Sequence, residues 1–250
     1  MSGIYKSNMR AICMENIIKF YEKYDEEGRL SRDKAHMVEY LVTIRYFDRL
    51  FEPGSRILDA CAGAGRYSFY LADKGHIVTA CDLVEHNIDI IKSNPKANIL
   101  DSILVCNAID LSQFDENIFN IVLCMGALYH INSDDLKEKV ISESVRVCKS
   151  GGIVVFSYLS TNKSEYIGPV PPPEFKGIFF NSDPCKIEDM AIKFGLEKMH
   201  HISTRSCSHF EDNLNEMSDE NFQKYMEHLY LTCEYESATG ALTLWIGKKL

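Results

Sequence analysis

The nine cysteines of this 250-residue chain never fall in a Cys-x-x-Cys spacing. Their odd number and scattered positions argue against a disulfide scaffold or a zinc ribbon, and predict reduced thiols in a cytoplasmic protein. The chain also lacks an apolar run of the roughly 20 residues that cross a bilayer. Its polar start, residues 1–10, has no apolar core of a signal peptide. We therefore expect neither a membrane protein nor a secreted one.

Positive charge is in deficit. The 27 Lys and Arg residues face 36 Asp and Glu residues, which gives a formal net charge of −9. A nucleic acid is therefore disfavoured as a partner, although a local basic patch stays compatible with this balance. With 46% hydrophobic and 25% charged residues, the composition is that of a globular chain and excludes disorder.

Short apolar runs alternate with helical stretches through the middle of the chain. This alternation is typical of parallel strands covered by helices on both faces, so the fold class is α/β. The predicted strands are 56–60, 76–82, 103–107, 119–125 and 153–158, and the predicted helices between them are 65–74, 84–93 and 134–149. After them we expect a helix at 185–194, a strand at 196–203, a helix at 220–231 and a strand at 241–248. The last two strands could pair antiparallel at one edge.

The strongest local signal is the stretch 57–65, Ile-Leu-Asp-Ala-Cys-Ala-Gly-Ala-Gly, where a predicted strand ends and a helix begins. Gly63 and Gly65 allow a sharp turn and let a ligand lie against the backbone. Asp82 ends the next strand, where a carboxylate can accept two hydrogen bonds from the vicinal hydroxyls of a ribose. Together these features predict an adenosine ligand; the alternative is a tight turn with a helix-capping aspartate.

The type of adenosine ligand depends on the charge beside this loop. Ser68 is small enough for the helix packing of an NAD site, so size does not exclude NAD. Asp59, however, places a carboxylate where a pyrophosphate would approach, and it suits the ammonium and sulfonium groups of S-adenosylmethionine. The chain also lacks a Gly-Lys-Ser/Thr phosphate loop.

The ordered motifs resemble those of class I S-adenosylmethionine-dependent methyltransferases. They are Asp59-x-x-x-Gly63-x-Gly65, Asp82, Asn107-Ala108, Phe119-Asn120-Ile121-Val122, Leu128-Tyr129-His130 and Lys149-Ser150-Gly151-Gly152. The likeness runs from about residue 15 to the C-terminus, and is greatest to bacterial small-molecule methyltransferases with a Leu-Tyr-His stretch after the fourth strand. It implies a Rossmann-like, mostly parallel seven-stranded sheet of order 3-2-1-4-5-7-6, with helices on both faces and lid insertions.

The resemblance also implies a cofactor, S-adenosyl-L-methionine, with S-adenosyl-L-homocysteine as product. It assigns Asp59, Ala60, Cys61, Gly63 and Gly65 to the methionine end, Asp82 to the ribose, Leu83, Asn107, Ala108 and Ile109 to the adenine, Met125 and Gly126 to the sulfonium, and Tyr24 and Arg29 to a closing segment. The chain departs from the family pattern at Cys61, Asn107 and Ser150, where glycine, aspartate and proline are usual. Cys61 is small enough to fit, and Asn107 can still accept from an adenine amino group.

One domain, residues 1–250, is expected. Residues 1–52 form a helical cap that ends at Pro53-Gly54, and residues 53–158 form the cofactor-binding core. Two segments, 159–183 and 206–240, interrupt the pattern and are predicted to form a lid over the acceptor, although 159–183 is also compatible with a flexible or exposed loop. Aromatic residues that could enclose a planar or cationic acceptor are Tyr158, Tyr166, Phe175, Phe179, Phe180, His209 and Tyr230.

His130 is the candidate general base, and Tyr129 could orient the acceptor. Methyl transfer from a sulfonium is an in-line displacement that depends mainly on positioning, and a base is needed only for a protonated nucleophile. An imidazole titrates near neutrality, which suits that role. The alternatives are a histidine that bonds the backbone to order its loop, and a tyrosine that only packs. No metal site is predicted, because Cys61, Cys81, Cys106 and Cys124, at the ends of neighbouring strands, are interpreted as buried small hydrophobic residues.

We therefore expect a cytoplasmic S-adenosylmethionine-dependent methyltransferase that acts on a small molecule at N, O, C or S. One alternative is an RNA or protein methyltransferase. It is weakened by the acidic balance and by Cys124-Met125-Gly126-Ala127, which stands where amine-modifying enzymes often carry Asn/Asp-Pro-Pro-Tyr. Another is a non-catalytic protein that binds an adenosine ligand. The intact Gly63, Gly65 and Asp82 argue against it. The acceptor and the oligomeric state stay open.

Overall fold

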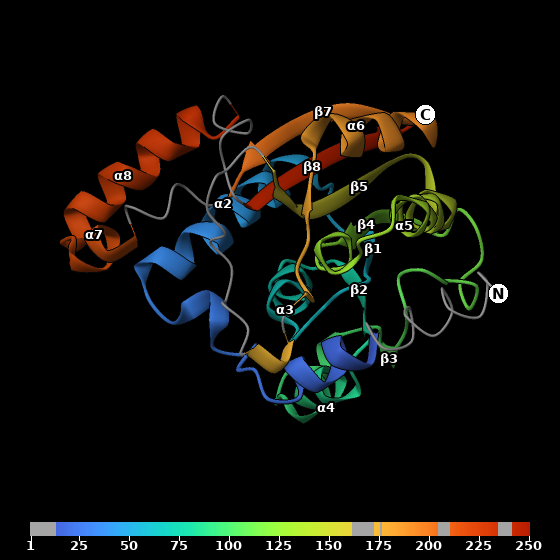
Figure 1. Ribbon diagram of the computed structural model, residues 1–250, viewed down its shortest axis with the longest axis horizontal. Helices are drawn as coiled ribbons and strands as arrows, with labels where there is room; N and C mark the ends of the chain where they lie inside the picture. Colours follow the sequence, from blue (N-terminus) through green and yellow to red (C-terminus); the bar gives the residue numbers. More distant parts are fainter. Residues whose placement is uncertain (1–13, 162–172, 176, 205–210, 235–241) are drawn as a thin grey trace.

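The computed structural model describes residues 14–161, 173–175, 177–204, 211–234 and 242–250, and these residues form one sheet with helices on both faces (Figure 1). The strands are β1 (Arg56–Asp59), β2 (Ile77–Asp82), β3 (Ser102–Val105), β4 (Phe119–Cys124), β5 (Cys148–Ser160), β6 (Asn181–Ser182), β7 (Leu196–Ser203) and β8 (Leu242–Lys249). Their order across the sheet is β3-β2-β1-β4-β5-β8-β7, and β6 pairs with β5.

This topology confirms the predicted fold. When the short β6 is left out, the path is the expected order 3-2-1-4-5-7-6. β8 runs antiparallel to both β5 and β7, as expected for the last two strands, and the other described pairs are parallel. Because β1, β2, β3 and β4 are parallel, their carboxyl ends meet along one edge of the sheet.

The helices cover the two faces of the sheet unequally. α2 (Lys34–Leu50), α3 (Arg66–Asp73) and α4 (Glu85–Ser93) pack on one face, and α5 (Asp134–Val147) and α6 (Pro184–Lys193) pack on the other. α7 (Glu211–Glu216) and α8 (Asp219–Thr232) lie beside α2, at the left of Figure 1. The 3-10 turns are η1 (Arg29–Ser31), η2 (Ala97–Ile99), η3 (Leu128–His130) and η4 (Pro173–Phe175), and residues 14–21 are also helical. In the described part of the chain, no helix has both the length and the apolar composition needed to cross a membrane.

The core is divided by the sheet into two apolar layers. Successive side chains of a strand point to opposite faces. In β4, Ile121 and Leu123 accordingly join the layer under α2 and α3, whereas Val122 and Cys124 join the layer under α5 and α6. Because helices pack on an apolar layer at each face of the sheet, both faces support the strands whose ends carry the site.

Local chemistry explains where several elements begin and end. The side chain of Asp33 accepts a hydrogen bond from the backbone N–H of His36 at the start of α2, and Asp183 does the same for Cys185 at the start of α6. α5 ends at Val147 rather than at the predicted residue 149, because Cys148 is already extended and pairs with Phe119. β6 and α7 were not predicted, since their two and six residues are too short to show a period.

The prediction of reduced thiols is wrong for one pair of cysteines. Cys81 at the end of β2 and Cys106 just after β3 are joined in a disulfide, with their Cα atoms 5.6 Å apart. Sequence spacing could not show this pairing, because the two residues come together only when β2 and β3 lie side by side. Cys61, Cys124, Cys148 and Cys185 are free thiols.

A matched pair of substitutions tests the position of the central strand. Ile121 in β4 is 2% exposed, whereas Ile192 in α6 is 54% exposed. Ile121→Ala should lower the free energy of unfolding by about 2–5 kcal/mol through lost burial and an internal cavity. Ile192→Ala should change it by less than about 0.5 kcal/mol. Urea unfolding measures both, and equal losses would contradict this assignment of the core.

Candidate functional site

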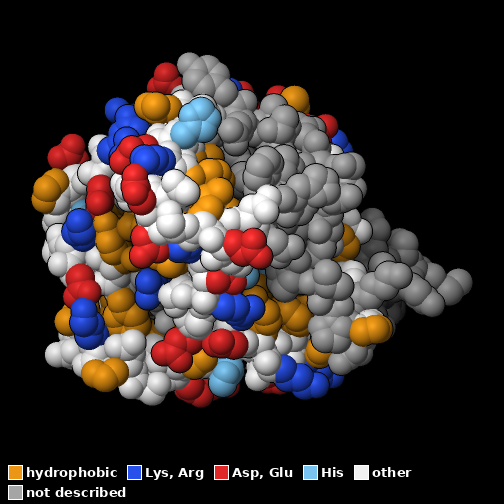
Figure 2. Space-filling view, turned by 90° about the vertical axis from the view of Figure 1, so that its left-hand side faces the viewer, with side chains coloured by type: hydrophobic (Ala, Val, Ile, Leu, Met, Phe, Trp, Pro, Cys, Tyr) orange, Lys and Arg blue, Asp and Glu red, His pale blue; other side chains and the backbone are white. Residues whose placement is uncertain are grey.

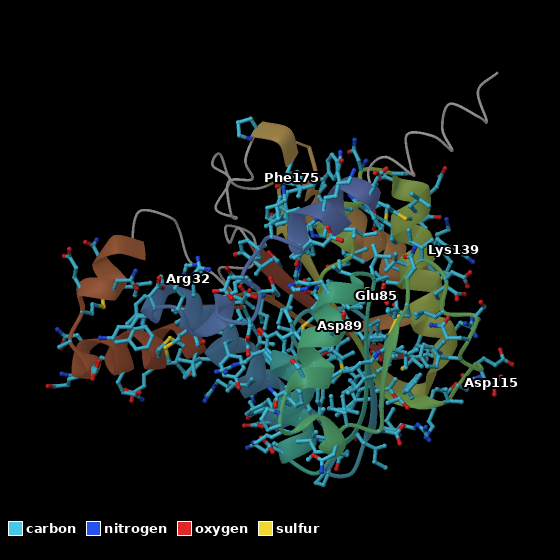
Figure 3. All side chains as sticks on the ribbon, turned by 90° about the horizontal axis from the view of Figure 1, so that it is seen from below. Arg32, Glu85, Asp89, Asp115, Lys139 and Phe175 are labelled. Carbon is cyan, nitrogen blue, oxygen red and sulfur yellow. A yellow bond between two sulfur atoms is a disulfide. The ribbon has the colours of Figure 1, made fainter. Side chains whose placement is uncertain are left out.

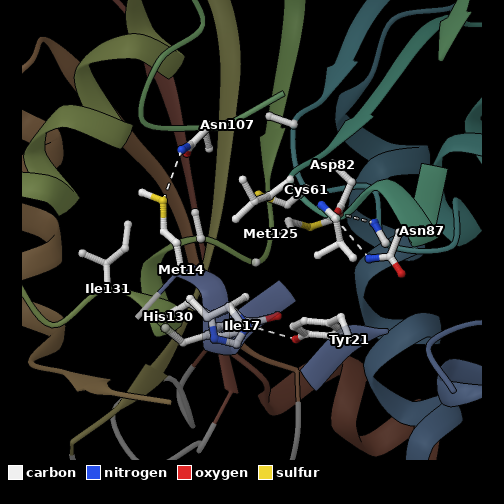
Figure 4. A pocket seen from close by; sticks show the side chains of 18 of the residues that line it. Met14, Ile17, Tyr21, Cys61, Asp82, Asn87, Asn107, Met125, His130 and Ile131 are labelled. Carbon is white, nitrogen blue, oxygen red and sulfur yellow. Dashed lines mark hydrogen bonds between the residues drawn. The ribbon is translucent and has the colours of Figure 1, made fainter. Parts of the chain in front are cut away.

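A cavity of about 570 Å³ lies at the carboxyl ends of β1, β2, β3 and β4 (Figure 4). Its walls come from the loops after these strands, from the helical residues 14–21, from η3 and from residues 177–180. Cavities of this size hold cofactors and small substrates. Open α/β sheets bind their ligands at this edge, so the cavity is the candidate site.

The Asp82 carboxylate faces this cavity from the end of β2. Its Oδ2 accepts a hydrogen bond of 2.8 Å from the N–H of Gly63, and its Oδ1 accepts from the N–H of Val84 at 2.9 Å and from Nδ2 of Asn87 at 3.2 Å (Figure 4). Burial raises the pKa of Asp82, and the hydrogen bonds from Val84 and Gly63 oppose that shift. Each carboxylate oxygen has two lone pairs, so Oδ2 keeps one for a hydroxyl group of a ligand.

Two glycines keep the backbone close to the cavity. Gly63 has a φ of +52°, which glycine adopts without strain, and an added Cβ there would lie 3.1 Å from Cγ of Glu26. An added Cβ at Gly126 would lie 2.9 Å from Cβ of Cys61. A side chain at Gly63 would therefore press on Glu26 and one at Gly126 on Cys61, so the close packing of these loops favours glycine.

The Asp59 carboxylate lies beneath the glycine loop, not in the cavity wall. Its Oδ2 accepts a hydrogen bond of 2.7 Å from Oγ of Ser68, and its Oδ1 is buried with no hydrogen-bond partner among the described residues. Burial raises the pKa of Asp59 to about 7; the Ser68 hydrogen bond opposes this shift, and the Asp82 charge adds to it. Asp59 is therefore a carboxyl group that takes up a proton easily.

A buried ion-pair cluster closes the cavity beside Gly63. Nε of Arg29 donates to Oε1 of Glu26 at 2.9 Å, and its Nη1 donates to Oε2 of Glu39 at 2.8 Å. Burial raises the pKa of Glu26. Although burial opposes it, the charges of Glu26 and Glu39 hold the pKa of Arg29 well above its ordinary value. Arg29 thus stays charged in the cavity wall.

Asn107 lines the cavity from the loop that follows β3. Its Oδ1 accepts a hydrogen bond of 3.0 Å from the N–H of Ile109, and its Nδ2 lies 3.8 Å from Sδ of Met14 (Figure 4). The Met14 side chain lines the same cavity. Asn107 therefore turns its amide donor toward Met14, and its Oδ1 keeps a second lone pair for a ligand.

His130 lies in η3 and is buried among aromatic rings. Its Nδ1 is 2.7 Å from the carbonyl oxygen of Ile178, and its Nε2 is 3.0 Å from Oη of Tyr21 (Figure 4). Because a carbonyl only accepts, Nδ1 carries the proton, and Nε2 accepts from the Tyr21 hydroxyl. Burial lowers the pKa of His130 to about 4, so the ring is neutral near pH 7. His130 thus bonds the backbone and also turns an acceptor nitrogen toward the cavity wall.

Most of the site residues expected from the sequence meet in this cavity. Those that line it are Arg29, Ala60, Cys61, Gly63, Asp82, Leu83, Asn107, Ala108, Ile109, Met125, Gly126, Tyr129 and His130. Asp59, Gly65 and Tyr24 are not among the lining residues. Gly65 precedes α3 as its N-cap, and the ring of Tyr24 stacks on Phe20 with centroids 5.2 Å apart.

Four further residues that were not expected from the sequence also line the cavity: Met14, Tyr21, Glu26 and Asn87. Asn87 had a usable signal, since a polar side chain in the first turn of α4 can reach back to the end of β2. Tyr21 ends the helical residues 14–21 and Tyr24 lies in the bend that follows, so their spacing along the chain does not show which ring enters the site. Met14 and Glu26 reach it only because the N-terminal segment docks over the loop.

The expected acceptor lid is only partly described. From 159–183, residues Gly177, Ile178 and Phe180 line the cavity, whereas Phe175 and Phe179 pack with Phe20. Of 206–240, residues 211–234 are described and none of them lines this cavity. Two expected aromatic residues lie elsewhere: Tyr158 hydrogen-bonds His201, and Tyr230 packs under Arg45. Residues 162–172, with Tyr166, and residues 205–210, with His209, lie outside the described residues.

The described residues contain no cluster of side chains that could bind a metal ion. Within them no three or more His, Cys, Asp or Glu residues are grouped so that they could hold a metal ion. The Sγ atoms of Cys61 and Cys124 lie 3.9 Å apart, and both side chains belong to the apolar layer under α5. They therefore pack as small hydrophobic groups.

The raised pKa of Asp59 predicts a pH-dependent stability. Between its ordinary pKa of 3.8 and about 7, the folded chain holds a proton that the unfolded chain has released. The stability contributed by this group is therefore present below about pH 4 and lost as the pH rises to about 7, by up to ~1.4 kcal/mol per pH unit. Asp59→Asn should remove this part of the slope in urea unfolding. The control Asp89→Asn, on the exposed face of α4 (Figure 3), should keep it, and identical slopes in wild type and Asp59→Asn would contradict the prediction.

Comparison with known proteins agrees with the geometry. Residues 58–156 match the protein family described as "Methyltransferase domain". The ubiquinone biosynthesis O-methyltransferase of Coxiella burnetii is 28% identical over 151 residues, which are 60% of this chain and 62% of that protein. The chain therefore spans 62% of the length of these curated relatives.

Solved structures share the fold. A protein from Pyrococcus horikoshii superposes with a TM-score of 0.64 at 15% identity, over 93% of this chain and 99% of that one. Magnesium protoporphyrin IX methyltransferase from Synechocystis, solved with bound S-adenosylmethionine, superposes with a TM-score of 0.55 at 12% identity, over 86% of this chain and 78% of that one. Residues 58–156 of this chain thus match a methyltransferase domain family, and the chain shares the fold of these solved structures.

Proposed function

We propose that this protein transfers a methyl group from S-adenosylmethionine to a small-molecule acceptor. One observation carries the proposal: Asp82, the glycine loop, the segment after β4 and His130 all line the same cavity. The residues fit the cofactor: Oδ2 of Asp82 has a lone pair for a ribose hydroxyl, and Gly63 lines the cavity with backbone alone. The family match and the shared fold support the same activity.

The proposed cofactor contacts divide among the strand ends. Asp82 would bind the ribose, and Leu83, Asn107, Ala108 and Ile109 would surround the adenine. Ala60, Cys61, Gly63 and the charged Arg29 would bind the methionine end, and Met125 and Gly126 would lie beside the sulfonium. When bound, S-adenosylmethionine supplies an activated methyl group. The chain's own task is then to exclude water and to hold the acceptor in line.

The acceptor is proposed to be a small molecule, methylated in the cytoplasm. The Coxiella burnetii relative is named for O-methylation in ubiquinone biosynthesis, which favours a hydroxyl acceptor over a macromolecule. On the face that Figure 2 shows, Lys and Arg are interspersed with Asp and Glu, and no basic track crosses the coloured residues. Such a surface does not favour a nucleic acid.

Calorimetry with S-adenosylhomocysteine tests the cofactor site. We expect saturable binding to the wild-type protein. Asp82→Asn should weaken it about tenfold or more, because an amide nitrogen cannot accept hydrogen bonds from Gly63 or a ribose hydroxyl. Asp89→Asn should bind as wild type, and thermal unfolding shows whether each variant is folded. Absence of heat with the wild-type protein would refute the proposal.

A metabolite extract tests the acceptor. Incubation with S-adenosylmethionine should form S-adenosylhomocysteine at a rate that increases when the extract is added. Activity that survives treatment of the extract with ribonuclease and protease indicates a small molecule. Activity abolished by either treatment would contradict the small-molecule assignment, while leaving the cofactor assignment intact.

A further inference from the structure

Tyr21 and His130 form a hydrogen-bonded pair in the cavity wall, although they come from opposite parts of the chain. Tyr21 belongs to the helical residues 14–21, and His130 ends η3 (Figure 4). The Ile178 carbonyl fixes the histidine proton on Nδ1, so the Tyr21 O–H points at Nε2. Within the described ranges, His130 is the hydrogen-bond partner of Tyr21 Oη, and the lone pairs of that oxygen remain for a ligand.

Both members of the pair are neutral, which fixes the direction of this hydrogen bond. Burial lowers the pKa of His130 to about 4. Burial also raises the pKa of Tyr21 well above 10; Tyr129, Glu26 and Asp82 add to this shift, and Arg29 opposes it. Near pH 7 the phenol therefore remains a donor to the imidazole, and its oxygen remains an acceptor toward the cavity.

The surroundings of the pair suit an uncharged group. The rings of Tyr21 and His130 meet edge to face with centroids 5.5 Å apart, and Phe179 lies 4.8 Å from the imidazole. Of the carboxylates that line the cavity, Glu26 is bonded to Arg29 and Asp82 to backbone amides, and Asp135 lines it from the start of α5. A neutral hydroxyl can donate to the Tyr21 oxygen, and burying it among these rings costs less desolvation than burying an ammonium ion.

We propose that Tyr21 binds the hydroxyl group of a neutral acceptor, and that His130 is a positioning residue that holds the Tyr21 oxygen as a hydrogen-bond acceptor. This inference rests on the proposed function and names the acceptor group that it uses. The Ile178 carbonyl keeps the histidine proton on Nδ1, so Nε2 accepts from the Tyr21 O–H, and the Tyr21 oxygen accepts from the hydroxyl of the acceptor.

Phenol and anisole are the probes for this contact, because they share a ring and differ in the hydroxyl donor. Each is titrated into the protein saturated with S-adenosylhomocysteine, and binding is followed by NMR. The wild type should bind phenol about five- to tenfold more tightly than anisole. Tyr21→Phe should remove this preference. Tyr24→Phe is the matched control, since Tyr24 stacks on Phe20 and does not line the cavity; it should keep the preference.

The nitrogen resonances of His130 give a readout that does not depend on activity. Wild-type protein should show a protonated Nδ1 and an unprotonated, hydrogen-bonded Nε2. In Tyr21→Phe, the Nε2 resonance should move toward that of a free imidazole nitrogen, while Nδ1 stays as in wild type. A protonated Nε2 in the wild type would overturn the proposal.

The other outcomes distinguish the role of Tyr21 from the proposed function of the protein. If the wild type binds S-adenosylhomocysteine but shows no saturable phenol binding, or binds phenol and anisole equally, the role of Tyr21 is refuted and the proposed function stands. A phenol preference that persists in Tyr21→Phe refutes it as well. If the wild type binds no S-adenosylhomocysteine, the proposed function itself fails.

Discussion

The Asp82 carboxylate is the constraint on which the geometry of this site depends. Its two oxygens bind the N–H of Gly63, after β1, and the N–H of Val84 with the amide of Asn87, at the start of α4. One side chain thus ties the ends of two neighbouring strands to the loops that follow them. Because the hydrogen bonds are buried, their loss would leave unpaired donors and let the glycine loop move. The free lone pair of Oδ2 is useful only because this frame is rigid.

Three carboxyl groups with raised pKa values lie around the glycine loop. Asp59, Asp82 and Glu26 all have raised pKa values, and burial is the largest cause in each case. Arg29 compensates part of this negative charge through Glu26 and Glu39. A cationic ligand would compensate more, because in a region of low dielectric each opposite charge favours the ionised carboxylate. The same electrostatics disfavours a pyrophosphate, although Asp59 acts from beneath the glycine loop and not from the cavity wall.

The sequence predicted the sheet well because strand and helix periods are local. Strands β1, β2 and β4 were found within two residues of their bounds, and the expected strand order is the observed one. The sequence predicted less well the contacts between residues that are far apart along the chain. The disulfide of Cys81 and Cys106 depends on two strands lying side by side, and Tyr21 rather than Tyr24 enters the cavity because of how the N-terminal helix docks. Neither follows from spacing along the chain.

By itself the sequence determined the α/β class, the glycine turn after β1 and the acidic end of β2, since each follows from residue type and local period. Only the tertiary structure decided the partners: that Asp82 binds the N–H of Gly63, that Arg29 bridges Glu26 and Glu39, and that His130 turns Nε2 to Tyr21. These contacts join residues from separate elements. Packing, not local propensity, sets the distance and direction between such elements, and it therefore sets the chemistry that their side chains share.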